Sequence, residues 1–361
     1  MRYKKLPAVF GAHYSDLLQV HESFFLDLLD KLGNAGTFLT RVKKGKSYIY
    51  YQLMSSGVKK EIYVGPKSEE LAKAITKVRL ERISLTTRGK SLVAAGAFSF
   101  DRSAGVTLRA LASGGVFYAG SVLVGTNAFL VYQNALGIKW QLSDQQATRT
   151  MDADIAQFSK FKVGVPLDAQ EKLKEVLESL HAEPVWNSLS PKNPPVAYRL
   201  SNSDFQIDFL SPLVGQETSN VASLPWLGVH AQPLRFLDYL IESPIRAVAL
   251  SGSNSFMVNL PEPERFALHK LILSERRSTT SFLKAGKDRA QAAALLEWAA
   301  DNTPDKIREA WNDLCRKGPA WKKLAQTAVS KLPSDIRNRL TEFGIGNKLN
   351  NSTVGRPRGT H

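Results

Sequence analysis

The stretch Val122-Leu123-Val124-Gly125-Thr126-Asn127-Ala128 governs how the middle of this chain is interpreted. A short apolar run, which is typical of a buried strand, stops at a glycine and a hydroxyl residue. We expect a second helix to begin near Asn127, after the Gly125-Thr126 turn. The segment from Val106 to Leu136 is therefore predicted to form a helix, a strand, a tight turn and another helix.

Three aspartates lie downstream of this turn. Asp152 and Asp154 are separated by one residue, and Asp208 ends an alternation of polar and apolar residues that begins at Asp204. Side chains two residues apart in a strand point to the same face, so Asp152 and Asp154 can face one site and Asp208 can join them from a neighbouring strand. Carboxylates of this kind suit hard cations. Two Mg²⁺ or Mn²⁺ ions there could stabilise both the attacking and the leaving oxygen of a phosphoryl or nucleotidyl displacement.

Composition narrows the class of protein. The 361 residues are 43% apolar, and 48 basic residues against 33 acidic ones give a formal charge of +15. This positive potential favours a polyanionic partner such as RNA, DNA or nucleotide phosphates. A single cysteine, Cys315, excludes an internal disulfide and a cysteine-rich zinc site, and the six histidines lack zinc-enzyme spacing.

A basic, tyrosine-rich segment precedes the central part of the chain. Two strand-like runs, 47–53 and 60–64, are separated by Ser55-Ser56-Gly57 and predict a β-hairpin. The hairpin could lie along a nucleic-acid backbone with its rings available for stacking. Alternatively, the tyrosines pack one face and the lysines are solvated. The candidate nucleic-acid-binding residues are Lys43, Lys44, Lys46, Tyr50, Lys59 and Lys60.

The order of these motifs resembles the DNA polymerase β-like nucleotidyltransferase superfamily, with Thr126 where that superfamily usually has serine. The closer resemblance is to a bacterial family of nucleotidyltransferase-fold proteins, and it extends from about Gly36 to Leu296. The stretches that carry it are Leu123–Ala128, Asp152–Asp154, Ile207–Leu210, Gly228–Leu234, Pro263–Leu271 and, in the hairpin, Tyr63–Pro66.

The resemblance implies a role for each matched residue. Asp152 and Asp154 would hold the metal that bridges the nucleoside triphosphate, and Asp208 would bind a second metal and help to activate the attacking hydroxyl. Gly125 would let the backbone approach the phosphates, to which the Thr126 hydroxyl and the amides at the start of the helix, from Asn127 onward, would donate.

A looser similarity links the later helices to abortive-infection type nucleotidyltransferase toxins. It rests on Lys270, Arg276, Lys287 and Asp288. The three basic residues would bind the nucleotide and offset the charge that develops on the pyrophosphate leaving group.

The expected fold class is α+β with a mixed-sheet nucleotidyltransferase core. An N-terminal helical region with the basic hairpin (about 47–64) would occupy 1–103, and the catalytic core 104–261. A C-terminal helical domain would follow at 262–346, and then a disordered basic tail at 347–361. Other expected elements are helices from Tyr14 to Leu32 and from Asp168 to Leu180, and strands at 196–200, 205–210, 247–250 and 256–258.

The leading functional hypothesis is metal-dependent transfer of a nucleoside monophosphate from an NTP to a hydroxyl of RNA, for example a tRNA. A toxin or defence role, with an antitoxin or another protein partner, stays open. The alternatives are transfer onto a protein side chain and a catalytically silent nucleic-acid-binding protein on the same scaffold. Glycines and polar residues interrupt the uncharged interval between Arg109 and Lys139, so we expect no membrane span and a cytoplasmic location. The sequence leaves the oligomeric state open.

Overall fold

The structure is a computed structural model that describes residues 1–24, 36–55, 58–142, 145–159, 169–186, 192–201, 203–213, 215–216, 221–277 and 282–346. The chain forms two compact units, Met1–Glu262 and Pro263–His361, and each is described by itself. In the described parts of the chain, no helix combines the length and the apolar character needed to cross a membrane.

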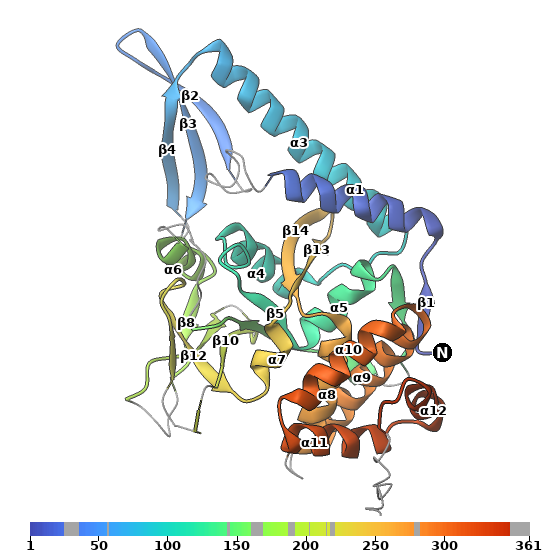
Figure 1. Cartoon of the computed structure of the whole chain (residues 1–361). Helices are drawn as coiled ribbons and strands as arrows, with labels where there is room; N and C mark the ends of the chain where they lie inside the picture. The colour runs from blue at the N-terminus through green and yellow to red at the C-terminus, as the bar shows by residue number, and fades with distance from the viewer. Residues whose placement is uncertain are drawn as a thin grey trace, which may run out of the picture. The chain divides into compact units, whose positions relative to one another are not determined.

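A mixed sheet forms the centre of the first unit (Figure 1). Its main path has the order β11-β12-β10-β7-β5, while β9 pairs with β10 and β8. Strands β7 and β12 run parallel to β10, whereas β9 runs antiparallel to it and β5 antiparallel to β7. The described strands are β5 (Val122–Val124), β7 (Asp152–Ala156), β8 (Ala182–Pro184), β9 (Ala197–Leu200), β10 (Gln206–Pro212), β11 (Ala222–Leu224) and β12 (Val229–Leu234).

Alternation along β7 and β10 separates a buried face from a more open one. Ala153, Ile155, Ile207 and Phe209 are completely buried. Burial of these apolar side chains fixes the register of the two strands, because a slip of one residue would exchange the faces. The acidic residues that alternate with them are thereby held on the opposite face.

Short elements surround this sheet. The strand β1 (Tyr3–Lys5) pairs with β6 (Ile138–Trp140), and the Trp140 ring stacks on Phe129. This pairing joins the N-terminus to the segment after the Gly125 turn, and the sequence analysis did not predict it. The other elements are α4 (Arg102–Ser113), α5 (Gly125–Ala135), the 3₁₀ helix η1 (Gln145–Thr148), α6 (Ala169–Ser179) and α7 (Leu237–Ile241).

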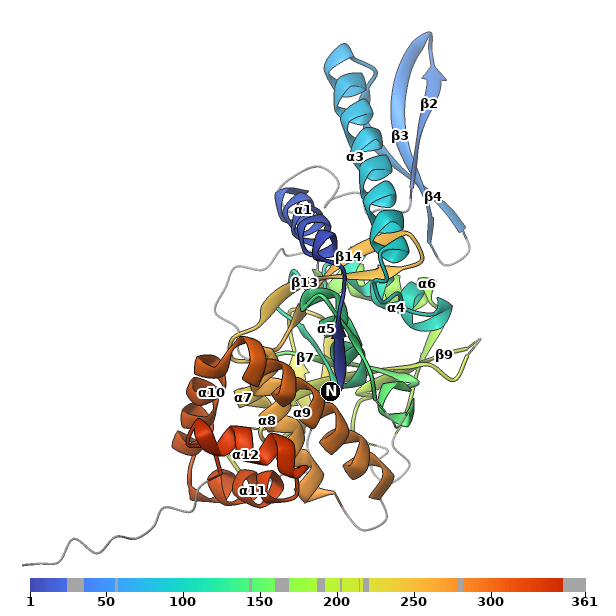
Figure 2. The same cartoon turned by 90° about the vertical axis from the view of Figure 1, so that its right-hand side faces the viewer.

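The long helix α3 (Glu69–Ala94), which Figure 2 shows, contributes to two hydrophobic clusters. Near its C-terminal end, Leu92 packs with residues of α1 (Ala8–Phe24) and of the hairpin β13 (Ile245–Ser251) and β14 (Asn254–Leu260). Near its N-terminal end, Ile75 and Val78 pack against a separate three-stranded sheet. That sheet has the order β2-β3-β4 and comprises β2 (Thr37–Lys43), β3 (Lys46–Ser55) and β4 (Val58–Pro66).

The second unit consists of helices in the part that the structure describes. Helix α8 packs against α9, α10 and α11, and α12 against α9. Their contacts bury apolar side chains such as Phe266, Leu295 and Leu314. The helices are α8 (Pro263–Arg276), α9 (Phe282–Asn302), α10 (Pro304–Arg316), α11 (Pro319–Ser330) and α12 (Ser334–Glu342).

The α+β class and the mixed sheet are confirmed. The basic hairpin is present as β3 and β4, but β2 adds a third strand that the sequence analysis missed. Helix α1 begins six residues before the expected Tyr14, because Phe10 extends the apolar stripe of Tyr14 and Leu17 by one turn. Residues 25–32 of that expected helix and the tail 347–361 lie outside the described residues. The expected boundary at 103/104 stays a prediction.

Candidate functional site

The three predicted carboxylates converge on one face of the central sheet. Asp154 on β7 is the direct partner of Asp208 on β10, and Asp152 is the partner of Gln206 two residues earlier. One carboxylate oxygen from each aspartate lies within 4.8 Å of the other two. All three side chains are partly exposed, so the carboxylate cluster of Asp152, Asp154 and Asp208 is accessible to solvent.

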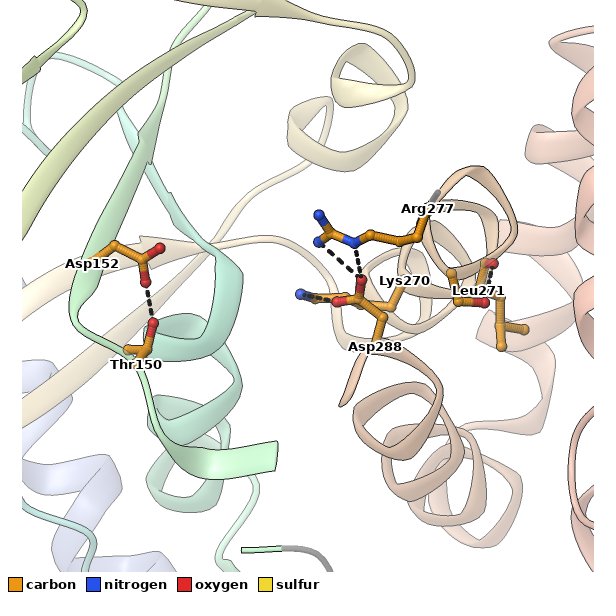
Figure 3. Close-up of polar contacts among 7 residues, drawn as sticks. Thr150, Asp152, Lys270, Leu271, Arg277 and Asp288 are labelled. Atoms are coloured by element: carbon orange, nitrogen blue, oxygen red, sulfur yellow. Dashed lines mark hydrogen bonds and ion pairs between the residues drawn. The ribbon is translucent and has the colours of Figure 1, made fainter. Parts of the chain in front are cut away.

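Neighbouring side chains hold this carboxylate cluster in place. Thr150 donates a short hydrogen bond to Oδ1 of Asp152, which Figure 3 shows. Gln206 Nε2 donates to Oδ1 of Asp208 at 2.6 Å. Asn127, which is 1% exposed, donates from Nδ2 to the backbone oxygen of Asp152 at 2.7 Å. These contacts orient Asp152 and Asp208 before any ligand binds.

Gly125 brings the start of α5 against the carboxylate cluster. Its φ of +66° lies in the left-handed region that favours glycine. A Cβ at this position would overlap the carboxylate of Asp154. The turn therefore requires glycine both for its backbone and for its close approach to Asp154. The helix that follows directs its first amide groups and the positive end of its dipole toward this end of the sheet.

A divalent cation fits the carboxylate cluster. Three carboxylates supply oxygen ligands at a separation that one or two small cations could bridge, and hard divalent cations prefer such ligands. Without a cation, the mutual repulsion of three negative charges at this distance is unfavourable. The residues that would hold the metal are thus Asp152, Asp154 and Asp208.

An arginine extends this face of the sheet beyond the aspartates. Arg199 on β9 pairs with Gln206, which pairs in turn with Asp152, so the three residues lie on the same face. The Arg199 side chain is exposed and lines an open cavity of about 480 Å³ with Glu183, Pro184, Ser201 and other residues of β8, β9 and the following turn. The positively charged side chain of Arg199 therefore lies two strands from Asp152.

A buried ionic cluster lies in the second unit (Figure 3). Lys270 Nζ donates to Oδ1 of Asp288 at 2.8 Å, and the Arg277 Nε donates to Oδ2 at 3.0 Å. The side chains of Lys270 and Asp288 are 8% and 3% exposed. Burial by itself would raise the pKa of Asp288, but the charges of Lys270 and Arg277 lower it below the ordinary value. Asp288 is thus a carboxylate anion that neutralises one of two cations.

The other candidate residues lie at defined positions. Thr126 is buried at the start of α5, while Arg276 is exposed and Lys287 half-buried in the second unit. The candidate nucleic-acid-binding residues all belong to the three-stranded sheet: Lys43 on β2, Lys44 in the turn after it, Lys46 and Tyr50 on β3, and Lys59 and Lys60 on β4.

Four residues of these sites were missed in the sequence analysis: Thr150, Gln206, Arg199 and Arg277. Gln206 could have been found from its period-two spacing to Asp208. Arg199 depends on the pairing of β9 with β10, which gives no local sequence signal. Arg277 is adjacent to Arg276, and helical periodicity does not specify which of the two meets Asp288.

Comparison with known proteins gives a match to a solved structure and a match to a family model. Among solved structures, an antigenic nucleotidyltransferase-like protein from Paracoccidioides brasiliensis matches with 15% identity and a TM-score of 0.32, over 62% of this chain and 93% of that chain. No curated protein matches. A family model described as nucleotidyltransferase matches residues 102–316, which include the Gly125 turn and all three aspartates. Since this match spans more than half of the 361 residues, the protein belongs to that nucleotidyltransferase family.

Proposed function

We propose that this protein transfers a nucleoside monophosphate from a nucleoside triphosphate to a hydroxyl group of RNA, with Mg²⁺ or Mn²⁺ held by Asp152, Asp154 and Asp208. The observation that carries the proposal is the convergence of these carboxylates within 4.8 Å, at a strand-to-helix turn. Family membership supports nucleotidyl transfer in general. Two bound cations would supply positive charge to the attacking and leaving oxygens.

The reaction makes one bond and breaks one. The acceptor hydroxyl oxygen attacks the α-phosphorus of the triphosphate, the bond from that phosphorus to the bridging oxygen breaks, and pyrophosphate leaves. Asp208 accepts the hydroxyl proton in this proposal, with Gln206 fixing its Oδ1. Asp152 and Asp154 face the triphosphate, and the hydrogen bonds from Thr150 and Asn127 hold Asp152 in position.

Phosphate binding needs donors near the aspartates. The amides that open α5 and the Thr126 hydroxyl are suited to it, because a helix N-terminus attracts anions and Gly125 has no side chain to block approach. Arg199 adds a cation on the same face. Lys270, Arg276 and Lys287 of the second unit are also proposed to bind the nucleotide.

RNA is the proposed acceptor because of charge. The chain carries a net charge of +15, and the exposed lysines of the three-stranded sheet gather part of this charge on one element. A polyanionic acceptor would be attracted to such a surface. A protein acceptor is the other outcome that an experiment must be able to detect.

Transfer of label from each of the four α-labelled NTPs tests the proposal. Wild-type protein, Asp152→Asn/Asp154→Asn and the control Asp305→Asn are incubated with Mg²⁺ or Mn²⁺ and either total RNA or protein. Asp305 is a suitable control because its side chain is 82% exposed in the second unit. We expect aspartate-dependent label in RNA. Label found only in protein would show that the acceptor is a protein and not RNA. Label transfer that persists in Asp152→Asn/Asp154→Asn would overturn the mechanism.

A further inference from the structure

The three-stranded sheet has two different faces. Cross-strand partners share a face, and Phe38 with Tyr51 lies on the face that packs against α3. Tyr51 is fully buried there, and its hydroxyl accepts hydrogen bonds from Arg82 and from the backbone of Gly36. This tyrosine is structural. Figures 1 and 2 both show α3 running along one side of the sheet, and α6 also contacts β3. We call the side of the sheet opposite α3 the open face.

Three tyrosines meet on the open face. Tyr50 is the partner of Tyr63, and their ring centroids are 5.5 Å apart in an edge-to-face arrangement. The Tyr48 ring lies 6.1 Å from the Tyr63 ring. Tyr63 is 54% exposed, although a ring of this size is usually buried more completely. The open face thus presents one accessible ring that two others hold in place.

Basic residues surround these rings. Lys43 Nζ donates to the Tyr50 hydroxyl at 3.1 Å, and Lys46 is the strand partner of Lys43. Arg41 is paired with Glu61, so that carboxylate is neutralised by a charge on the same face. Lys59, also exposed, is the second residue of β4. Flat rings and positive charge therefore occur together on the open face.

We propose that the open face binds single-stranded RNA, with a base stacked on Tyr63 and backbone phosphates bound by Lys43 and Lys46. This inference deepens the proposed function and rests on it, since the bound strand would be the acceptor. Stacking requires an unpaired base, which RNA loops and ends supply and which a duplex keeps inside its own stack. The lysines complement the phosphate charge of the same strand.

The aromatic part of the proposal is tested by RNA binding without NTP. Fluorescence anisotropy with a labelled, unstructured RNA of about 12 nucleotides compares wild-type protein with Tyr63→Ser and Tyr63→Phe. Loss of one stacked base is expected to weaken binding at least about fivefold. Tyr63→Phe keeps the ring and should bind as wild type does. Tyr118→Ser is the matched control, because Tyr118 is 45% exposed and lies outside this sheet.

The proposed phosphate contacts of Lys43 and Lys46 are tested by the salt dependence of RNA binding. Lys43→Gln/Lys46→Gln should reduce the slope of log K against log salt by about 1.4, because each phosphate contact to a single strand contributes about 0.7. Lys73→Gln/Lys77→Gln removes two exposed lysines from α3 and should leave the slope nearly unchanged. Circular dichroism and thermal melting of each variant establish that the sheet still folds.

Three results would overturn the inference. They are RNA affinity that Tyr63→Ser leaves unchanged, equal losses of affinity in the test and control variants, and equal affinity for duplex RNA of the same sequence. Binding is also measured in Asp152→Asn/Asp154→Asn. If that variant binds RNA through Tyr63 but the wild type transfers no label, the proposed function fails and the RNA surface stands. If label transfer depends on the aspartates but RNA affinity does not depend on Tyr63, the proposed function stands and only the RNA-binding role of the open face is wrong.

Discussion

Gly125 and Asp154 lie so close together that a Cβ on the glycine would overlap the aspartate carboxylate. This contact connects the start of α5 with the carboxylate cluster and gives the turn two independent reasons to be glycine. We propose that the start of α5 binds phosphate and that the carboxylates bind metal, and a methyl group added at Gly125 tests whether the two act together.

Gly125→Ala should impair transfer while leaving a folded protein. The positive φ and the displaced carboxylate are expected to destabilise the fold by about 1–3 kcal/mol. Transfer should fall at least about tenfold, because Asp154 must move out of the carboxylate cluster. Chemical denaturation and label transfer measure the two effects. Gly11→Ala is the control, since Gly11 lies in α1 with nothing within 4 Å of an added Cβ; equal activity loss in both variants would contradict the interpretation.

Gln206→Leu should act through Asp208. It removes the 2.6 Å hydrogen bond that orients Oδ1 while keeping the strand and the side-chain volume. We expect the Mg²⁺ concentration for half-maximal transfer to rise about tenfold, because Asp208 is no longer held in position. This corresponds to a loss of about 1.4 kcal/mol in the free energy of Mg²⁺ binding. Gln232→Leu, an exposed change on β12, should leave the Mg²⁺ requirement as it is. An unchanged requirement in Gln206→Leu would remove this residue from the site.

Asp288→Asn should destabilise the second unit. It leaves the buried charge of Lys270 without its carboxylate, for which a cost of about 3–5 kcal/mol is typical. Lys270→Met/Asp288→Leu removes both charges and should be far less destabilised, because Arg277 is 33% exposed and can turn to solvent. Denaturation with urea distinguishes the two.

The same double variant tests whether Lys270 also binds phosphate. A stable double variant whose NTP affinity is reduced about tenfold would support the proposed contact between Lys270 and phosphate. That reduction equals about 1.4 kcal/mol of binding free energy. A stable double variant with wild-type NTP affinity would assign Lys270 to structure alone.

His21 should make stability depend on pH. It is buried between α1 and β14, its Nε2 lies 2.8 Å from Ser255 Oγ, and burial lowers its pKa to about 4. In the unfolded chain His21 takes up a proton near pH 6.5, whereas in the folded state it stays neutral down to about pH 4. Its contribution is therefore present above pH 6.5 and is lost as the pH falls toward 4, by about 3 kcal/mol in all.

Substitution of His21 isolates this contribution. The free energy of unfolding of His21→Gln should fall less between pH 6.5 and pH 4 than that of the wild type. His13→Gln serves as the control, because His13 is exposed on the same helix. Parallel pH profiles for wild type and His21→Gln would show that this histidine is not the titrating group.

The residues that the sequence predicted best are those whose geometry is local. Asp152 and Asp154 had to share a face once β7 was recognised as a strand, and the Gly125 turn had a local signature. The meeting of Asp154 with Asp208 required a guess about strand order, which the structure confirms.

Long-range pairing explains part of what the sequence analysis missed. Arg199 reaches the face of the three aspartates only because β9 lies antiparallel to β10. Strand β2 is a different case, because the two-residue turn Lys44-Gly45 joins it to β3 and has positive φ at both residues, a local signal that the sequence analysis overlooked. The tyrosines of the two hairpin strands also divide between a structural role at Tyr51 on β3 and an exposed position at Tyr63 on β4. The local pattern of residues specifies neither the pairing of β9 with β10 nor which face of the three-stranded sheet α3 covers.

One measurement tests nucleotidyl transfer by the carboxylate cluster most directly. Wild-type protein and the single variants Asp152→Asn, Asp154→Asn and Asp208→Asn are given RNA, Mg²⁺ and an NTP that carries its label on either the α- or the γ-phosphate. We predict that the α-label enters RNA, that the γ-label leaves as pyrophosphate, and that each substitution slows transfer at least about a hundredfold. Entry of the γ-label instead, or transfer that persists in all three variants, would contradict the proposed mechanism.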